Sequence, residues 1–298
     1  GARVDPTPPK SSPRKRHLIS ITDLRRADIE RVLETAEGFE SVMRRDLKKV
    51  PTLRGRTVMT MFFEASTRTS SSFELAAKRL SADTVSLKAS GSSVDKGESL
   101  RDTVQTLSAY DPDVIVIRHP AVGAAGMITA WTDAHVVNAG DGTHQHPTQC
   151  LLDLYTMRAA LGAIDGIHVA IVGDVLHSRV ARSNILGLRT MGANVTLVGP
   201  PTLIPRDAAA LGAEVSHSMS ALEAADVVYV LRMQRERMAP GASYVPSLSE
   251  YASVWGVTPA RLRPSQLVMH PGPINRGVEV APEVADSAAS RIIDQVRA

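Results

Sequence analysis

Short apolar runs rich in β-branched residues alternate along the chain with segments whose apolar positions recur every three to four residues. The runs are typical of buried strands, and the second spacing is typical of helices that cover a sheet. Their alternation predicts an α/β fold of β-α units on parallel sheets. The predicted strands cover residues 57–63, 84–87, 114–118, 135–138, 168–172, 194–198, 214–217, 227–231 and 267–270.

Two helices bear on the domain organisation. The segment 147–161 begins with a proline, which suits a first helical turn, and it follows the fourth predicted strand, so we expect it to bridge two domains. The segment 285–298 is predicted as one amphipathic helix with Ile292, Ile293 and Val296 on one side. We expect this last helix to pack back on the first domain.

The length also favours two domains, since 298 residues exceed the ~100 to 200 residues of an ordinary domain. We predict domains at 17–148 and 149–284, each a parallel β-sheet flanked by helices, joined by interdomain helices. Residues 1–16 are rich in proline and carry five Lys/Arg against one Asp. This composition predicts a disordered tail or residues foreign to the natural protein.

The tail accounts for the basic character of the chain. Its net charge is +4 within a total of +3, so the remainder is close to neutral. With only 4% aromatic residues and no basic stripe, we expect no nucleic-acid binding. No apolar run approaches the ~20 residues of a membrane span. The one cysteine, Cys150, cannot close an internal disulfide, which favours a reducing cytoplasm.

Polar side chains gather directly after the first predicted strand. Ser66, Thr67, Arg68 and Thr69 open a helix, where backbone N–H groups and the helix dipole favour an anion. Three hydroxyls and one guanidinium add donors in the same four residues. The alternative is an ordinary Ser/Thr N-cap beside a solvated arginine. The density of donors favours a phosphate site.

Further polar residues follow other strands, at the edge where parallel sheets bind ligands. Arg118 could complete a phosphate clamp, and His146 could donate to a carbonyl oxygen or merely cap a helix. Arg179 and Arg232 could hold carboxylates or be solvated. His144 and His146 are a weak metal signal, and we predict no metal. The chain also lacks GxGxxG, GxxxxGK[ST] and GxSxG, which argues against dinucleotide enzymes, P-loop NTPases and α/β-hydrolases.

Seven motifs carry a family resemblance. They are FFEASTRT (62–69), SVDKGES (93–99), IRHP (117–120), NAGDGTHQHPTQ (138–149), VGDVLHSR (172–179), LRMQRER (231–237) and HPGPINRG (270–277). In these motifs and their order the chain resembles the aspartate and ornithine carbamoyltransferases from His17 onward. The resemblance implies carbamoyl transfer from carbamoyl phosphate to an amino acid, without a cofactor. Two features favour aspartate over ornithine as the acceptor. The ornithine branch lacks the LRMQRER pattern, and it has a cysteine where this chain has HPGP.

The resemblance also implies ligands for carbamoyl phosphate. Those of the phosphate are Ser66, Thr67, Arg68, Thr69 and Arg118. Those that polarise the carbamoyl oxygen are Thr69, Arg118 and His146. Those at the carbamoyl amide are Gln149 and the backbone carbonyls of Pro271 and Gly272, next to Pro273, where the family has a cis peptide. One departure is Ser70, where many relatives have an arginine.

For aspartate, the implied ligands are Arg179, Arg232, Gln234 and Lys96. Ser92 and Lys96 belong to a Ser- and Gly-rich segment, 88–100, that we predict to be a mobile lid. In the family these two positions reach into a neighbouring subunit's site, which implies a homotrimer with shared active sites. Regulatory chains or a dihydroorotase remain open as further partners.

No carboxylate dyad or Cys/His pair is placed for covalent catalysis, so we predict direct attack of the aspartate amine on the carbamoyl carbon. Two alternatives stay open. One is a carbamoyltransferase for another amino acid, such as ornithine. The other is a non-catalytic protein that binds phosphate metabolites.

Overall fold

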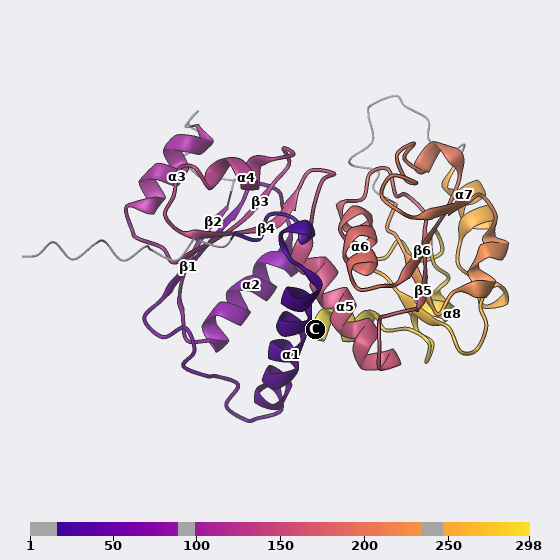
Figure 1. The fold of residues 1–298 in the computed structure, drawn as a ribbon, viewed down its shortest axis with the longest axis horizontal. Coiled ribbons are helices and arrows are strands. Elements are labelled where there is room, and N and C mark those ends of the chain that lie inside the picture. Colours follow the sequence, from indigo (N-terminus) through magenta and orange to yellow (C-terminus); the bar gives the residue numbers. More distant parts are fainter. Residues whose placement is uncertain (1–16, 89–98, 234–246) are drawn as a thin grey trace, which may run out of the picture.

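The computed structural model describes residues 17–88, 99–233 and 247–298. Within these residues two parallel sheets lie side by side, each flanked by helices, with a long helix between them (Figure 1). The predicted fold class is therefore confirmed. None of the helices in this part of the chain combines the length and apolar character needed to cross a membrane.

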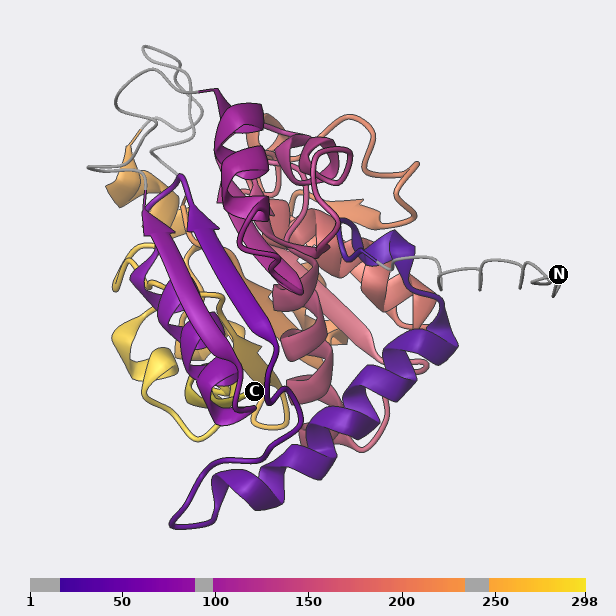
Figure 2. The same ribbon diagram turned by 90° about the vertical axis from the view of Figure 1, so that its left-hand side faces the viewer.

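The first sheet has the strand order β2-β1-β3-β4, and all its pairs are parallel. Its strands are β1 (Thr57–Phe62), β2 (Asp83–Lys88), β3 (Val114–His119) and β4 (His135–Asp141). In β1 every residue after the first is buried, as expected for a central strand that is covered on both faces. Figure 2 shows β1 and β2 side by side, with α1 running past their lower ends.

The second sheet has the order β7-β6-β5-β8-β9 and is also parallel throughout. Its strands are β5 (His168–Val172), β6 (Asn194–Val198), β7 (Glu214–Ser216), β8 (Val227–Val230) and β9 (Leu267–Met269). All nine predicted strands are thus present in the described residues. The bounds match the predicted ones or differ from them by one residue, except that β4 continues three residues further, to Asp141.

The helices were predicted less completely than the strands. The α-helices are α1 (Arg26–Met43), α2 (Thr67–Arg79), α3 (Leu100–Ser108), α4 (Ala124–Ile128), α5 (Pro147–Leu161), α6 (Arg179–Thr190), α7 (Leu248–Trp255), α8 (Pro282–Ala285) and α9 (Ile292–Arg297). Short 3-10 helices are η1 (Ile21–Asp23), η3 (Pro201–Leu203), η4 (Met219–Ala224) and η6 (Pro259–Arg261). After β6 and β7 the expected helical segments are only η3 and η4, because prolines and a short connection leave no room for a longer helix.

The prediction of a single C-terminal helix over 285–298 was wrong. Between α8 and α9 the backbone pairs with β9: the Val268 N–H donates to the Ala289 carbonyl at 3.0 Å, and the Arg291 N–H donates to the Val268 carbonyl at 2.9 Å. These long-range hydrogen bonds replace a helical turn. The predicted apolar face also differs, since Ile292 is buried while Ile293 and Val296 are 63% and 62% exposed.

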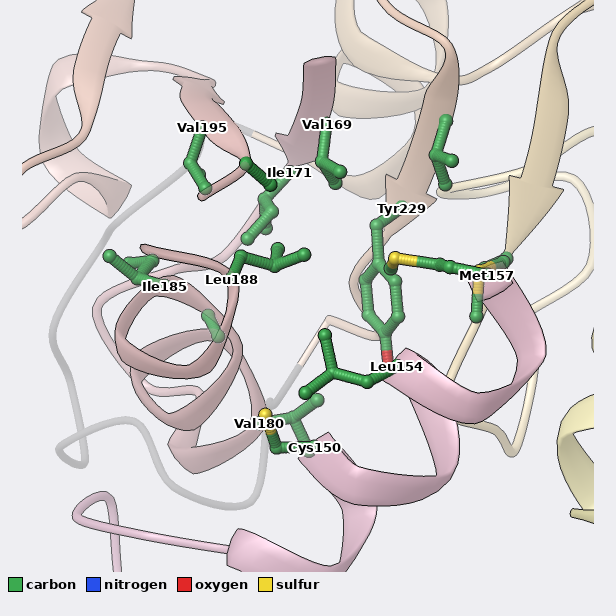
Figure 3. Packing of buried hydrophobic residues seen from close by; sticks show 14 of the residues in the cluster. Cys150, Leu154, Met157, Val169, Ile171, Val180, Ile185, Leu188, Val195 and Tyr229 are labelled. Carbon is green, nitrogen blue, oxygen red and sulfur yellow. The ribbon is translucent and has the colours of Figure 1, made fainter. Parts of the chain in front are cut away.

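The helix α5 has the bounds that its sequence predicts and lies between the sheets. Its residues Cys150, Leu154 and Met157 are fully or almost fully buried in the largest apolar cluster, which also contains Ile29 of α1 and Ile171 of β5. Figure 3 shows these α5 side chains facing the second sheet and α6. Two helices from the first half of the chain therefore share a core with the second sheet, and the boundary at 148 stays a prediction.

The strand orders locate one crevice in each sheet. In the first sheet the chain leaves β1 toward β2 on one side and leaves the neighbouring β3 toward β4 on the other. In the second sheet it likewise leaves β5 toward β6 and the neighbouring β8 toward β9. Ligands of open parallel sheets bind at such switch points, beyond the carboxyl ends of the strands. Residues after β1, β3, β5 and β8 are therefore the first candidates for a site.

Candidate active site

A cleft of about 1180 Å³ lies at these strand ends, between the two sheets. It is lined by every predicted site residue that the structure describes: Ser66, Thr67, Arg68, Thr69, Arg118, His146, Gln149, Arg179, Arg232, Pro271, Gly272 and Pro273. These residues are up to 207 positions apart in the chain, from Ser66 to Pro273, and they lie around one cleft as predicted. Ser92, Lys96 and Gln234, together with most of the segment 88–100, lie outside the described residues.

The start of α2 forms the end of the cleft on the first sheet. Ser66 is the N-cap, and its hydroxyl oxygen accepts the Thr69 N–H at 3.3 Å. The capping alternative is therefore observed, but it is compatible with anion binding. Capping uses a lone pair of the hydroxyl oxygen and leaves its proton to be donated to a ligand. The helix dipole and the neighbouring donors point to the same position.

Arg118 lies beside this helix because β3 pairs in register with β1, with Arg118 opposite Phe62. Its Nη1 atom lies 3.3 Å from the Thr69 hydroxyl and 3.4 Å from the Ala139 carbonyl, and donates to both. Since the Thr69 oxygen accepts from Arg118, its own proton is directed elsewhere. A guanidinium and a hydroxyl are thus fixed together at the edge of the cleft.

Glu64 is a member of the site that our sequence analysis did not single out. One of its carboxylate oxygens, Oε1, accepts from Arg118 Nη2 at 3.1 Å and from Arg179 Nη2 at 2.8 Å. Arg118 belongs to the first sheet and Arg179 to α6 on the second. Glu64 therefore joins the two sheet units across the cleft. Its place within FFEASTRT, directly after a strand, was the available signal.

Arg179 begins α6 and is only 2% exposed, so the alternative of a solvated arginine was wrong. Its guanidinium lies against Gly140, where a Cβ atom would come within 2.7 Å of the arginine Cζ and where φ is +121°. Arg179 also donates to the Gly142 carbonyl at 3.4 Å. The glycines of NAGDG thus make room for a cation that arrives from the other unit.

His146 and Gln149 stand at the start of α5. The His146 side chain is buried, with 7% of the residue exposed. The backbone N–H of His146 donates to the Ser183 hydroxyl at 2.9 Å, and this contact connects the start of α5 to α6. The Gln149 amide nitrogen donates to the buried Asp153 carboxylate at 3.1 Å. Because the amide nitrogen is used in this way, the Gln149 amide oxygen can accept a hydrogen bond from a ligand.

The segment after β9 closes the cleft from the second unit. It contains the cis Gly272–Pro273 peptide that the resemblance implied. A Cβ atom on Gly272 would come within 1.6 Å of Arg68 Nη1, so the guanidinium packs directly on this backbone. His270 Nδ1 lies 2.8 Å from the Gly272 nitrogen and accepts its hydrogen, and His270 Nε2 lies 3.0 Å from Glu279, to which it donates. These two contacts fix the orientation of the segment.

The cleft carries a strong positive charge. Among its described lining residues are Arg68, Arg118, Arg179 and Arg232, opposed by a single acidic side chain, that of Glu64. Such a field attracts anionic ligands and holds two of them close together. In the described ranges, no group of three or more His, Cys, Asp and Glu side chains converges to hold a metal ion.

Two family models match the chain. The aspartate/ornithine carbamoyltransferase carbamoyl-P binding domain matches residues 16–159, and the Asp/Orn binding domain of the same family matches residues 165–298. The chain belongs to the aspartate/ornithine carbamoyltransferase family. Aspartate carbamoyltransferase catalytic subunits from Salinispora arenicola and Moorella thermoacetica are 56% and 52% identical to it. The alignments cover 94% and 95% of this chain and 93% and 92% of those proteins.

Solved structures of this carbamoyltransferase family agree with the fold. Aspartate transcarbamoylase from Trypanosoma cruzi, in complex with carbamoyl phosphate and aspartate, has a TM-score of 0.85 at 32% identity, covering 95% of this chain and 92% of that one. The catalytic subunit of M. jannaschii aspartate transcarbamoylase has a TM-score of 0.81 at 34% identity, covering 94% and 93%.

Proposed function

We propose that this chain transfers the carbamoyl group of carbamoyl phosphate to the amine of L-aspartate, giving N-carbamoyl-L-aspartate and phosphate, an early step of de novo pyrimidine (UMP) biosynthesis. One observation carries the proposal. The donor-rich start of α2 and the buried Arg179 of α6 face a single cleft, so one site offers a phosphate position and a carboxylate position side by side.

The main task of such a site is to hold two anionic substrates in contact. Arg68 and Arg118 neutralise the phosphate, while Arg179 and Arg232 neutralise the carboxylates of aspartate. Binding both in one cleft makes the reaction effectively unimolecular and aligns the amine with the carbamoyl carbon. When aspartate binds, its carboxylate shares or displaces the contact that Arg179 makes with Glu64.

The chemistry follows from the donors around the carbamoyl oxygen. The neutral amine of aspartate attacks the carbamoyl carbon, and the resulting tetrahedral oxyanion is stabilised by donors from Thr69, Arg118 and His146. The carbon–oxygen bond to phosphate then breaks, and the bonding electrons leave with the phosphate. The departing phosphate accepts a proton from the former amine. Transfer is direct, so no carbamoyl-enzyme forms.

The test compares acceptors. Purified protein is incubated with carbamoyl phosphate and either L-aspartate or L-ornithine, and the carbamoyl amino acid is quantified against phosphate. We expect product with aspartate only, in a one-to-one ratio with phosphate. Product with ornithine would reassign the carboxylate site. Tight binding of carbamoyl phosphate without turnover of either acceptor would instead support a non-catalytic metabolite-binding protein.

We further propose a homotrimer with shared active sites in a reducing cytoplasm. The family resemblance of Ser92 and Lys96 supports it, and light scattering should give the mass of three chains. A complementation assay tests the sharing. Lys96→Gln and Arg68→Ala chains should each have strongly reduced activity alone, but mixed trimers should regain activity by combining an intact Lys96 with an intact Arg68. No recovery would contradict shared sites. Regulatory chains or a dihydroorotase would appear as co-eluting partners.

A further inference from the structure

Asp153 is a buried carboxylate in the middle of α5, with no exposed surface. Four donors converge on it. Gln149 Nε2 and Gln295 Nε2 donate to Oδ1 at 3.1 and 2.9 Å. Asn184 Nδ2 and the Tyr229 hydroxyl donate to Oδ2 at 3.0 and 2.6 Å. Figure 3 shows Tyr229 reaching from β8 toward α5. The carboxylate therefore joins α5, α6, β8 and α9 at one point.

The contact with Gln149 decides which end of that amide faces the cleft. A carboxylate offers only acceptors, so Gln149 must turn its NH₂ group toward Asp153. Its carbonyl oxygen is then left for a ligand. A ligand amide presents N–H donors, which need that oxygen. The reversed orientation would present N–H against N–H and exclude such a ligand.

The same carboxylate oxygen controls a second part of the cleft through Gln295. Gln295 donates to Asp153 with its nitrogen and accepts the His270 N–H with its oxygen at 2.9 Å. His270 in turn accepts the Gly272 N–H at 2.8 Å, which orients the Pro271–Gly272 backbone. Asp153 Oδ1 thus fixes the orientation of two groups that carry acceptor oxygens: the Gln149 side-chain amide and the Pro271–Gly272 backbone.

We propose that Asp153 is the positioning residue for recognition of the carbamoyl NH₂ group, acting through Gln149 on one side and through Gln295 and His270 on the other. The inference rests on the proposed function, because it takes a carbamoyl amide as the ligand. Asp153 lies behind these groups and does not line the cleft, so it acts only by fixing their orientation.

The ionised form of Asp153 performs this role, since all four neighbours donate to it. Burial raises the pKa of Asp153 to about 6, opposed by these hydrogen bonds, so the carboxylate is charged at neutral pH. The two other titratable groups around it, Cys150 and Tyr229, have pKa values raised above their ordinary range by burial. They stay protonated under the same conditions.

The test separates amide recognition from general damage to the site. Two non-hydrolysable phosphonates are titrated by calorimetry: phosphonoacetamide, which carries the NH₂ group, and 2-oxopropylphosphonate, which has a methyl group in its place. The ratio of their dissociation constants measures recognition of the NH₂ group alone. It is compared in the wild type, in Asp153→Asn, and in the control Tyr229→Phe, which removes a donor from Oδ2 but leaves both contacts of Oδ1.

We expect the wild type to prefer phosphonoacetamide by about tenfold, the effect of a satisfied hydrogen bond in a buried site. Asp153→Asn should abolish this preference, because an asparagine amide no longer requires Gln149 to turn its NH₂ group inward. The Tyr229→Phe control should keep it. Since 2-oxopropylphosphonate does not use the NH₂ contacts, its affinity should stay within about twofold across the three proteins.

An unchanged ratio in folded Asp153→Asn overturns the proposal, as does an equal loss of affinity for both phosphonates. If Asp153→Asn does not fold, Gln295→Met serves instead: it cuts the connection to His270 and should lower the ratio, and an unchanged ratio overturns the proposal. A wild type that transfers the carbamoyl group but has no preference between the phosphonates overturns this inference alone. A wild type without turnover overturns the proposed function as well.

Discussion

The Glu64 carboxylate gives a sharp test of how the two sheet units are held together at the cleft. Its Oε1 atom binds Arg118 at 3.1 Å and Arg179 at 2.8 Å, and the three side chains are 26%, 11% and 2% exposed. Glu64→Gln keeps the shape and an acceptor oxygen but removes the charge. Charge-assisted hydrogen bonds are about twice as strong as neutral ones, so each contact should weaken by about 1 kcal/mol.

We therefore expect Glu64→Gln to lower the free energy of unfolding by about 2 kcal/mol. With an m-value of about 3 kcal/mol/M, the urea midpoint would fall by about 0.7 M, measured by tryptophan fluorescence at one protein concentration. The matched control is Glu37→Gln, which removes the same charge from a pair with Arg158 in which the Glu37 side chain is 69% exposed. Exposed pairs contribute little, so this midpoint should hardly move. Equal midpoints for both variants would refute the reasoning.

Arg68→Ala should lower kcat by about 10²–10³-fold, as loss of a preorganised donor to developing charge does, and phosphate release under saturating substrates measures it. Gly140→Ala should raise the KM for aspartate by about tenfold because its Cβ would displace Arg179. Gly162→Ala also strains a positive φ but meets nothing within 4 Å, so its KM should not change. Because burial raises the pKa of Asp153 to about 6 from 3.8, the folded state binds this proton more tightly than the unfolded state does. The free energy of unfolding that Asp153 contributes should therefore fall as the pH rises from about 4 to about 6. Urea unfolding of the wild type and of Asp153→Asn measures this: the difference between their free energies of unfolding should decline over that range, and a rise would contradict the argument.

The strands, and the part of the site that follows β1 and β3, could be predicted from local patterns. Apolar runs located all nine strands of the described residues, since a buried parallel strand is a short continuous apolar run that can be recognised from the local sequence. The polar residues after β1 and β3 were correctly expected at one edge, because the parallel fold dictates where strand ends meet. The bounds of α5 followed from its proline and its periodicity.

What failed depends on partners far away in the sequence. The backbone between α8 and α9 is held by β9, and no local signal shows this competition. Glu64 was given no role from the sequence, because its partner Arg179 is 115 positions away. Asp153 was likewise given no role from the sequence, although it accepts hydrogen bonds from α6, β8 and α9. Only the packed structure reveals such networks.

The central claim is direct carbamoyl transfer between two substrates held in one cleft, and a single-turnover experiment tests it most directly. Enzyme in excess is mixed rapidly with aspartate and carbamoyl phosphate that is labelled in its carbonyl carbon. Labelled carbamoyl aspartate and free phosphate are then followed after acid quenching. We predict that both appear with the same rate constant and in equal amounts, with no label on the protein. Phosphate released ahead of carbamoyl aspartate, or label retained on the chain, would contradict the account.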